Sequence, residues 1–218
     1  MLRVGLTGNI ASGKSQAALV FGELGAHIID ADVIVPGLLA GGTPTCKKVV
    51  ETFGEGVLNP DGSVDRKKLA AIVFNDTEKR LLLNSLIHPE VRREVLRRIA
   101  ELEEKSPGGG IIIVEAALMV ESGSYKAYDR LIVATCDPDR QLSRIMSRDG
   151  LSIEDARARV AAQMPMQEKL KVADYSIETS GTFGETRKQI ESIYRDLLIV
   201  ERKLVSHEGR KKTDVSVR

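Results

Sequence analysis

The sequence is poor in cysteine and has almost no net charge. It holds two cysteines, Cys46 and Cys136, in 218 residues, and 32 basic residues nearly balance 31 acidic ones, which gives a net charge of +1. The two cysteines are far apart and lack any metal-binding spacing, so we expect ordinary reduced thiols in a cytoplasmic protein. The charge balance excludes a whole-protein field that would attract nucleic acid or an anionic membrane.

Long apolar runs are also missing. No stretch approaches the roughly 20 apolar residues that a membrane-spanning helix needs. The chain opens with MLRVGLTG, without the basic start, apolar segment and small-residue cleavage site of a signal peptide. The polar segment 206–218 is typical of a disordered tail. We therefore expect a cytoplasmic monomer with neither a membrane nor a nucleic acid as partner.

Strand-like and helix-like segments alternate in the first and last parts of the chain. Short apolar runs typical of buried strands occupy residues 2–8, 27–32, 111–116, 130–137 and 174–178. Helical patterns occupy residues 14–24, 140–148 and 183–203. Strands that alternate with helices predict an α/β fold, in which a parallel sheet lies between layers of helices.

The block between the second and third of these strands has a different texture. From residue 33 to 109, glycine and proline turns alternate with charged helical stretches such as PEVRREVLRRIAELEEK. Apolar residues of that stretch repeat at helical spacing, at Val91, Val95, Ile99 and Leu102. The block is too long for a simple crossover, so we expect a helical subdomain inserted into a core formed by residues 1–32 and 110–205.

The glycine-rich segment GNIASGKS is the strongest single motif. Residues 8–15 fit the pattern Gly, any four residues, Gly, Lys, Ser, and they lie between a predicted strand and a predicted helix. The main-chain N–H groups of such a loop and the helix N-terminus bind phosphate. Lys14 supplies a positive charge for the β- and γ-phosphates, and Ser15 supplies a hydroxyl for Mg²⁺. The alternative is a glycine turn with a structural role only. Predicted ATP contacts are Gly8, Asn9, Ile10, Ala11, Ser12, Gly13, Lys14, Ser15 and Gln16.

Other nucleotide-binding classes need features that the sequence does not have. It contains no Asn-Lys-x-Asp segment to read guanine, which excludes a switch GTPase, and it is too short for a large motor or transporter ATPase. A small-molecule kinase needs an acceptor pocket, a base near the acceptor hydroxyl and arginines for the migrating charge.

Carboxylates follow two of the predicted strands, where ligands of open parallel sheets collect. Asp30 and Asp32 share one side of an extended segment, and we favour Asp32 as the base that accepts the acceptor's proton. Glu115 directly follows the apolar run IIIV and is a candidate to hold the metal, often through water. The alternatives are helix caps for the two aspartates and a surface charge for Glu115.

An arginine-rich segment occupies about residues 140–165. Arg140, Arg144 and Arg148 are spaced by four and share one helix face, where they repel one another unless an anion lies nearby. One interpretation is a lid whose arginines neutralise charge on the transferred phosphoryl group. The other is a solvated stripe paired with the neighbouring aspartates.

Several motifs, in order from about residue 2 to 201, resemble the dephospho-coenzyme A kinase family. VGLTGNIASGKS resembles the P-loop of that family and HIIDAD its second strand. FGEGVLNPDGSVDRKKLAAIVF and LNSLIHPEVR resemble parts of its inserted domain. EAALMVESG stands where the family has an acid, a Pro-Leu-Leu and a Glu, and QLSRIMSRDGLSIEDARARVAAQMPMQEKLKVADYSIE resembles the lid and last strand.

The resemblance implies a P-loop NTPase core with five parallel strands, a helical acceptor domain and a lid. It also implies transfer of the γ-phosphate of Mg²⁺-bound ATP to the ribose 3′-hydroxyl of dephospho-coenzyme A. Asp32 matches the general base, Lys14 and Ser15 the phosphate and magnesium residues, and Arg144 the lid arginine. Further implied ATP contacts are Arg148 and Thr179, and implied acceptor contacts are Thr7, Asp30, Asp32, His88, Glu115 and Leu118. Gln163 and Lys169 also match motif positions. His88, which precedes Pro89 at an expected helix start, has the alternatives of a cap or a buried imidazole.

The chain departs from the family pattern at several positions. Asn9 and Ala11 replace glycines; asparagine tolerates a positive φ angle, whereas alanine does not, so nucleotide affinity suffers if position 11 requires one. The other departures are Gln16, Pro36, Ala117 and Thr179, the last in place of an asparagine near the adenine. None removes a principal residue, so we expect activity. The rivals are a kinase for another small hydroxylated acceptor, such as a nucleoside or sugar acid, and a non-catalytic ATP-sensing module.

Overall fold

The computed structural model describes residues 1–74 and 76–214. The chain divides into two compact units: residues 1–29 together with the chain from residue 102, and residues 30–101. The helical unit therefore spans 30–101 rather than the expected 33–109. Helix α9 (Phe183–Asp214) runs past residue 206, so the expected tail begins inside a helix, and residues 215–218 lie outside the described residues. No helix in the described part of the chain is long and apolar enough to cross a membrane.

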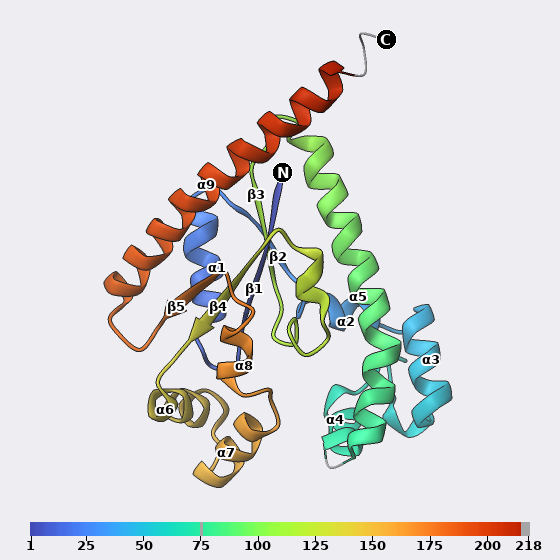
Figure 1. The fold of residues 1–218 in the computed structure, drawn as a ribbon. Coiled ribbons are helices and arrows are strands. Elements are labelled where there is room, and N and C mark those ends of the chain that lie inside the picture. The colour runs from blue at the N-terminus through green and yellow to red at the C-terminus, as the bar shows by residue number, and fades with distance from the viewer. Residues whose placement is uncertain (75, 215–218) are drawn as a thin grey trace. The chain divides into compact units, whose positions relative to one another are not determined.

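The first unit is built on a five-stranded parallel sheet, as predicted (Figure 1). Its strands are β1 (Leu2–Gly8), β2 (His27–Asp30), β3 (Ile111–Glu115), β4 (Arg130–Thr135) and β5 (Tyr175–Glu178), in the order β2-β3-β1-β4-β5. In the parallel pairing of β1 with β3, Leu6 lies opposite Glu115. The glycine-rich loop and Glu115 therefore emerge at the same end of the sheet.

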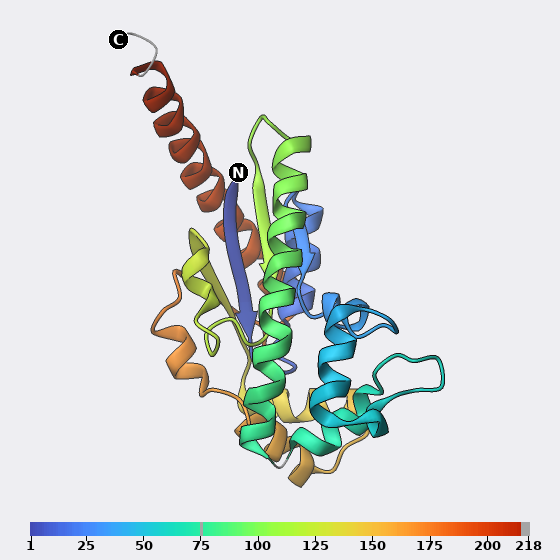
Figure 2. The same cartoon turned by 90° about the vertical axis from the view of Figure 1, so that its right-hand side faces the viewer.

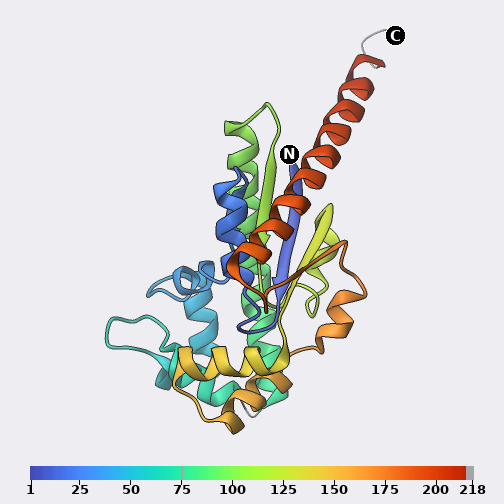
Figure 3. The ribbon, with the colours of Figure 1, turned by 90° about the vertical axis from the view of Figure 1, so that its left-hand side faces the viewer.

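Helices α1 (Lys14–Glu23) and α9 cover one face of this sheet. Their apolar side chains and those of the strands form one buried cluster, which includes Val4, Phe21, Ile132, Ile190 and Leu197. Figures 2 and 3 show α9 running along the sheet and continuing past the start of β1. The remaining helices of this unit are η2 (Ser124–Ala127), α6 (Pro138–Asp149), α7 (Ile153–Ala161) and α8 (Met166–Leu170).

The connection between β3 and β4 packs on the opposite face. Gly5 faces this connection, and a Cβ atom there would lie 2.5 Å from the sulfur of Met119. Met119 is itself almost fully buried. The approach of Met119 to the backbone of β1 therefore requires a glycine in the strand.

The helical unit has a hydrophobic core of its own, which includes Leu39, Val49, Val57, Leu69 and Ile87. Its elements are α2 (Ile34–Leu38), α3 (Pro44–Phe53), η1 (Glu55–Val57), α4 (Arg66–Phe74) and α5 (Thr77–Lys105), whose last turn belongs to the first unit. Val95 and Ile99 are buried on α5, as their spacing predicted.

Helix α5 corrects the interpretation of Pro89. The sequence placed this proline at a helix start, but α5 begins at Thr77 and Pro89 lies inside it. A proline inside a helix removes one backbone hydrogen-bond donor. Apolar residues on both sides of it, Ile87 and Val91, pack on the same cluster of the helical unit. We attribute the continuation of the helix through Pro89 to this burial, which compensates for the lost hydrogen bond.

Candidate active site

The glycine-rich loop ends at Gly13, which only glycine can occupy. This residue has φ 82° in the left-handed region, and a Cβ there would lie 2.9 Å from Thr179 side-chain atoms. Gly13 is the N-cap of α1 and provides no side-chain cap. The N-terminus of α1 therefore opens into the loop without a capping side chain, which is the arrangement that binds phosphate.

Ala11, in the glycine-rich loop, adopts a left-handed backbone conformation. It has φ 58°, and no other non-glycine residue in the described part of the chain has a positive φ. The left-handed conformation costs an L-residue roughly 1–2 kcal/mol, whereas glycine adopts it without that cost. The chain therefore has an alanine at a position whose conformation favours glycine.

Ala11→Gly is therefore expected to stabilise the protein. The relieved strain, less the greater entropy of glycine in the unfolded chain, amounts to about 0.5–1 kcal/mol. That corresponds to a rise in Tm of roughly 1–4 °C by thermal unfolding. The matched control is Ala158→Gly, at an exposed position inside α7, which should lower stability by about 1 kcal/mol. Equal destabilisation by both substitutions would show that Ala11 is not strained.

The side chains of Arg144 and Thr179 form hydrogen bonds with the backbone of the glycine-rich loop. Arg144 donates to the carbonyl oxygens of Ala11 at 3.2 Å and Thr179 at 2.6 Å, and to Oγ1 of Thr179 at 2.9 Å. Thr179 Oγ1 in turn donates to the carbonyl of Ser12 at 2.9 Å, and Thr179 is 2% exposed. The structure therefore places the Arg144 guanidinium against the backbone of the glycine-rich loop. The buried side chain of Thr179 supports the same loop through the carbonyl of Ser12.

Arg148 of α6 and Arg159 of α7 have a different partner from Arg144. Arg148 forms an ion pair with Asp149 at 2.7 Å, and Arg159 pairs with the same carboxylate at 2.8 Å. Hydrogen bonding from Arg148 lowers the pKa of Asp149. The solvated-stripe interpretation thus describes Arg148 in this structure, whereas Arg144 is directed to the loop.

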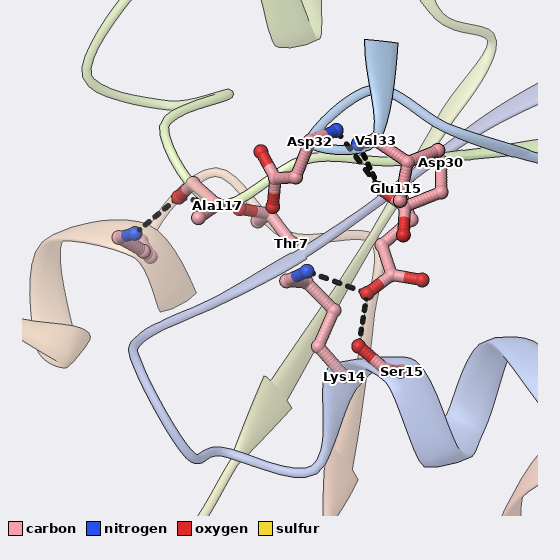
Figure 4. Close-up of polar contacts among 9 residues, drawn as sticks. Thr7, Lys14, Ser15, Asp30, Asp32, Val33, Glu115 and Ala117 are labelled. Carbon is pink, nitrogen blue, oxygen red and sulfur yellow. Dashed lines mark hydrogen bonds and ion pairs between the residues drawn. The ribbon is translucent and has the colours of Figure 1, made fainter. Parts of the chain in front are cut away.

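Glu115 is the centre of the candidate site (Figure 4). It is 2% exposed, and its Oε1 accepts hydrogen bonds from Lys14 Nζ and from Ser15 Oγ, both at 2.6 Å. The surface-charge alternative for Glu115 is therefore wrong. A buried carboxylate is stable when an ammonium group and a further donor compensate it, and here the glycine-rich loop and α1 supply both.

The same cluster has the chemistry of a divalent-cation site. A carboxylate and a hydroxyl are hard oxygen ligands, and they meet where the phosphates of a nucleotide would end. Among the side chains that the structure describes, no group of three or more His, Cys, Asp or Glu could hold a metal. Such an ion would therefore complete its coordination with phosphate and water oxygens, as Mg²⁺ commonly does in nucleotide sites.

The predicted acceptor residues have varied surroundings. In the helical unit, Asp30 Oδ1 accepts from the N–H groups of Asp32 at 2.8 Å and Val33 at 3.3 Å, in the turn before α2 (Figure 4). Helix α2 has Val33 as its N-cap and no side-chain cap, so Asp30 does not cap it. The side chain of Asp32 is exposed. His88 is half-buried, and burial lowers its pKa. Leu118 is 38% exposed in the connection after β3.

Thr7, another predicted acceptor residue, is fully buried in this structure. Its Oγ1 donates to the carbonyl of Ala117 at 3.2 Å, which ties the end of β1 to the connection after β3. The side chain therefore presents no surface to an acceptor. Because the side chain is buried, its hydroxyl bonds to backbone rather than to water, and this bond fixes the connection after β3.

Two glutamines form hydrogen bonds with the backbone of Ile10 in the glycine-rich loop, and the sequence alone gave neither of them this role. Ile10 N–H donates to Gln163 Oε1 at 2.7 Å, and the carbonyl of Ile10 accepts from Gln141 Nε2 at 2.7 Å. Gln163 matched a family position without an evident role, and Gln141 had only one signal, a polar residue on the buried face of an amphipathic helix.

Known proteins resemble this chain over most of its length. A family model described as dephospho-CoA kinase matches residues 2–185. The chain belongs to the dephospho-CoA kinase family. The dephospho-CoA kinase of Aquifex aeolicus is 44% identical over 197 residues, which cover 90% of this chain and 98% of that protein. The one from Carboxydothermus hydrogenoformans is 45% identical over 190 residues, covering 87% and 91%.

A solved structure of a dephospho-CoA kinase has the same fold. The enzyme from Campylobacter jejuni is 31% identical, with a TM-score of 0.66 over 89% of this chain and 96% of that one. A crystal structure of a Thermus thermophilus protein, 30% identical, gives a TM-score of 0.76 over 90% and 97%. The resemblance of the motifs to the dephospho-CoA kinase family is thus confirmed across nearly the whole chain.

Proposed function

We propose that this protein transfers the γ-phosphate of ATP to the ribose 3′-hydroxyl of dephospho-coenzyme A and releases coenzyme A and ADP, the last step of coenzyme A biosynthesis. The observation that carries the proposal is the convergence of Lys14 and Ser15 on buried Glu115, beside a phosphate-binding loop. Membership of the dephospho-CoA kinase family supports the choice of acceptor. The proposed setting is a monomer in the cytoplasm.

The proposed divalent ion is Mg²⁺, held by the hydroxyl of Ser15 and, directly or through water, by Glu115. When bound, it neutralises charge on the β- and γ-phosphates. Lys14 Nζ lies on the same carboxylate and would hold the terminal phosphate oxygens. The loop amides and the N-terminus of α1 orient the triphosphate for in-line transfer.

The transfer itself forms one bond and breaks one. The acceptor oxygen forms a bond to the γ-phosphorus, and the bond from that phosphorus to the bridging oxygen of ADP breaks. We assign the proton of the 3′-hydroxyl to the carboxylate of Asp32, an exposed side chain of the helical unit. We assign stabilisation of the transferred phosphoryl group to Arg144, which already contacts the loop carbonyl of Ala11.

Incubation with Mg-ATP and a set of acceptors tests the proposal. With dephospho-coenzyme A, we expect a product heavier by one phosphoryl group, with the mass of coenzyme A, and an equal amount of ADP by chromatography. A nucleoside and a sugar acid, offered separately, should give neither. Product only with one of these would establish a different acceptor, and ATP binding without transfer to any acceptor would establish the sensing module.

A further inference from the structure

The segment from Gln163 to Lys169, here called the brace, contacts both halves of the site in the first unit. At its start, Gln163 Oε1 accepts from Ile10 N–H at 2.7 Å, and the carbonyl of Met164 accepts from Asn9 Nδ2 at 3.2 Å. At its end, Lys169 Nζ donates to the carbonyl of Ala117 at 3.0 Å. One short segment therefore holds the glycine-rich loop and the connection after β3.

Lys169 is an unusual residue to find at such a contact. Its side chain is fully buried, and its ammonium group forms an ion pair with Glu121 at 2.8 Å. The buried carboxylate oxygens of Glu121 accept no hydrogen bond of good geometry within the described residues, so this ion pair compensates the carboxylate. Because a buried charge is costly, a lysine placed here for packing alone would be a poor choice.

The carbonyl that Lys169 binds belongs to the connection that directly follows Glu115. Ala117 follows Glu115 by two residues, and its oxygen also accepts from Thr7 Oγ1 at the end of β1. The backbone directly after Glu115 is thus fixed by donors from two other elements. Glu115 in turn binds Lys14 and Ser15.

We propose that the brace sets the position of the glycine-rich loop relative to Glu115, with Gln163 and Lys169 as positioning residues at its two ends. Each residue acts through backbone that carries the site, Gln163 through Ile10 and Lys169 through Ala117. The catalytic part of this inference rests on the proposed function. Its central consequence is that Lys169 controls how well Glu115 and Ser15 together bind the divalent cation.

The experiment measures Mg²⁺ dependence in two ways. Binding of a fluorescent ADP analogue is titrated with and without Mg²⁺, and the Mg²⁺ concentration for half-maximal kinase rate is measured separately. For Lys169→Met we expect the Mg²⁺-dependent gain in ADP affinity to fall about tenfold, with the Mg²⁺-free affinity unchanged, and the half-maximal Mg²⁺ concentration to rise about tenfold. For Gln163→Ala we expect weaker ADP binding with and without Mg²⁺. Lys169→Arg should recover part of the loss.

Two further variants make the outcome decisive. Lys171→Met is the matched control, because Lys171 is an exposed lysine that pairs with Glu168 at 2.6 Å next to α8; its Mg²⁺ dependence should equal that of the wild type. If Lys169→Met does not fold, Lys169→Met combined with Glu121→Leu removes both buried charges and restores stability, but the Mg²⁺ dependence should still be weakened. A folded Lys169 variant with wild-type Mg²⁺ dependence overturns the proposal. The ADP titration needs no acceptor, so an inactive wild-type protein would overturn the proposed function and leave this result standing.

Discussion

Asp32→Asn is expected to lower the turnover of dephospho-coenzyme A about a thousandfold and to leave the affinity for ATP within about twofold. The substitution keeps the size of the side chain but removes the carboxylate that we assign as proton acceptor, and general bases contribute roughly 10²–10⁴-fold. Affinity for ATP is kept because the phosphate-binding residues belong to the glycine-rich loop. Steady-state kinetics with both substrates, and ADP binding at equilibrium, measure the two effects.

Asp61→Asn is the matched control for this prediction. Asp61 lies in the same helical unit, is exposed, and accepts hydrogen bonds from the N–H and the hydroxyl of Ser63. Both substitutions therefore remove one negative charge from an exposed aspartate of that unit. We expect Asp61→Asn to retain turnover within about twofold, since surface changes of this kind are usually small. If the Asp32 variant also kept near-wild-type turnover, Asp32 would not be the base.

The sheet could be predicted from the sequence because its central strands β1, β3 and β4 are buried on both faces. IIIVE and the apolar part of RLIVATCD are continuous apolar runs, and all five residues of β3 are buried. Their alternation with helices limits the arrangement to a parallel α/β sheet. Pro89 shows the limit of local rules. Proline is common at the first position of a helix, but here apolar packing on both sides of Pro89 allows α5 to continue through it.

The candidate site could be predicted only where one segment determines it. The glycine-rich loop and its place between strand and helix were evident, and Glu115 followed from its position after IIIV. What the sequence could not show is that Lys14 and Ser15 share a single oxygen of Glu115, about a hundred residues away along the chain. The supporting contacts of Thr7, Thr179 and Lys169 were hidden for the same reason, because each joins segments that are distant in sequence.

Lys14→Met is expected to lower turnover by about two to three orders of magnitude and also to destabilise the protein. The lost ammonium is a preorganised charge for the terminal phosphate, and removing one such group costs roughly 10²–10³-fold in rate. The stability effect has a separate cause, because Glu115 stays buried without its ammonium partner. Breaking a buried ion pair in this way costs about 3 kcal/mol, or a fall in Tm of roughly 6–12 °C.

The double variant Lys14→Met with Glu115→Gln separates these two effects. The glutamine carries no charge and its amide oxygen can still accept from Ser15, so thermal unfolding should recover most of the lost Tm. Turnover should not recover, because neither the ammonium nor the carboxylate is present to hold the phosphates and the ion. A single variant with wild-type Tm would mean that another group compensates Glu115. Recovery of turnover in the double variant would mean that the pair serves the fold and not the transfer, since only a structural role is restored by removing both charges together.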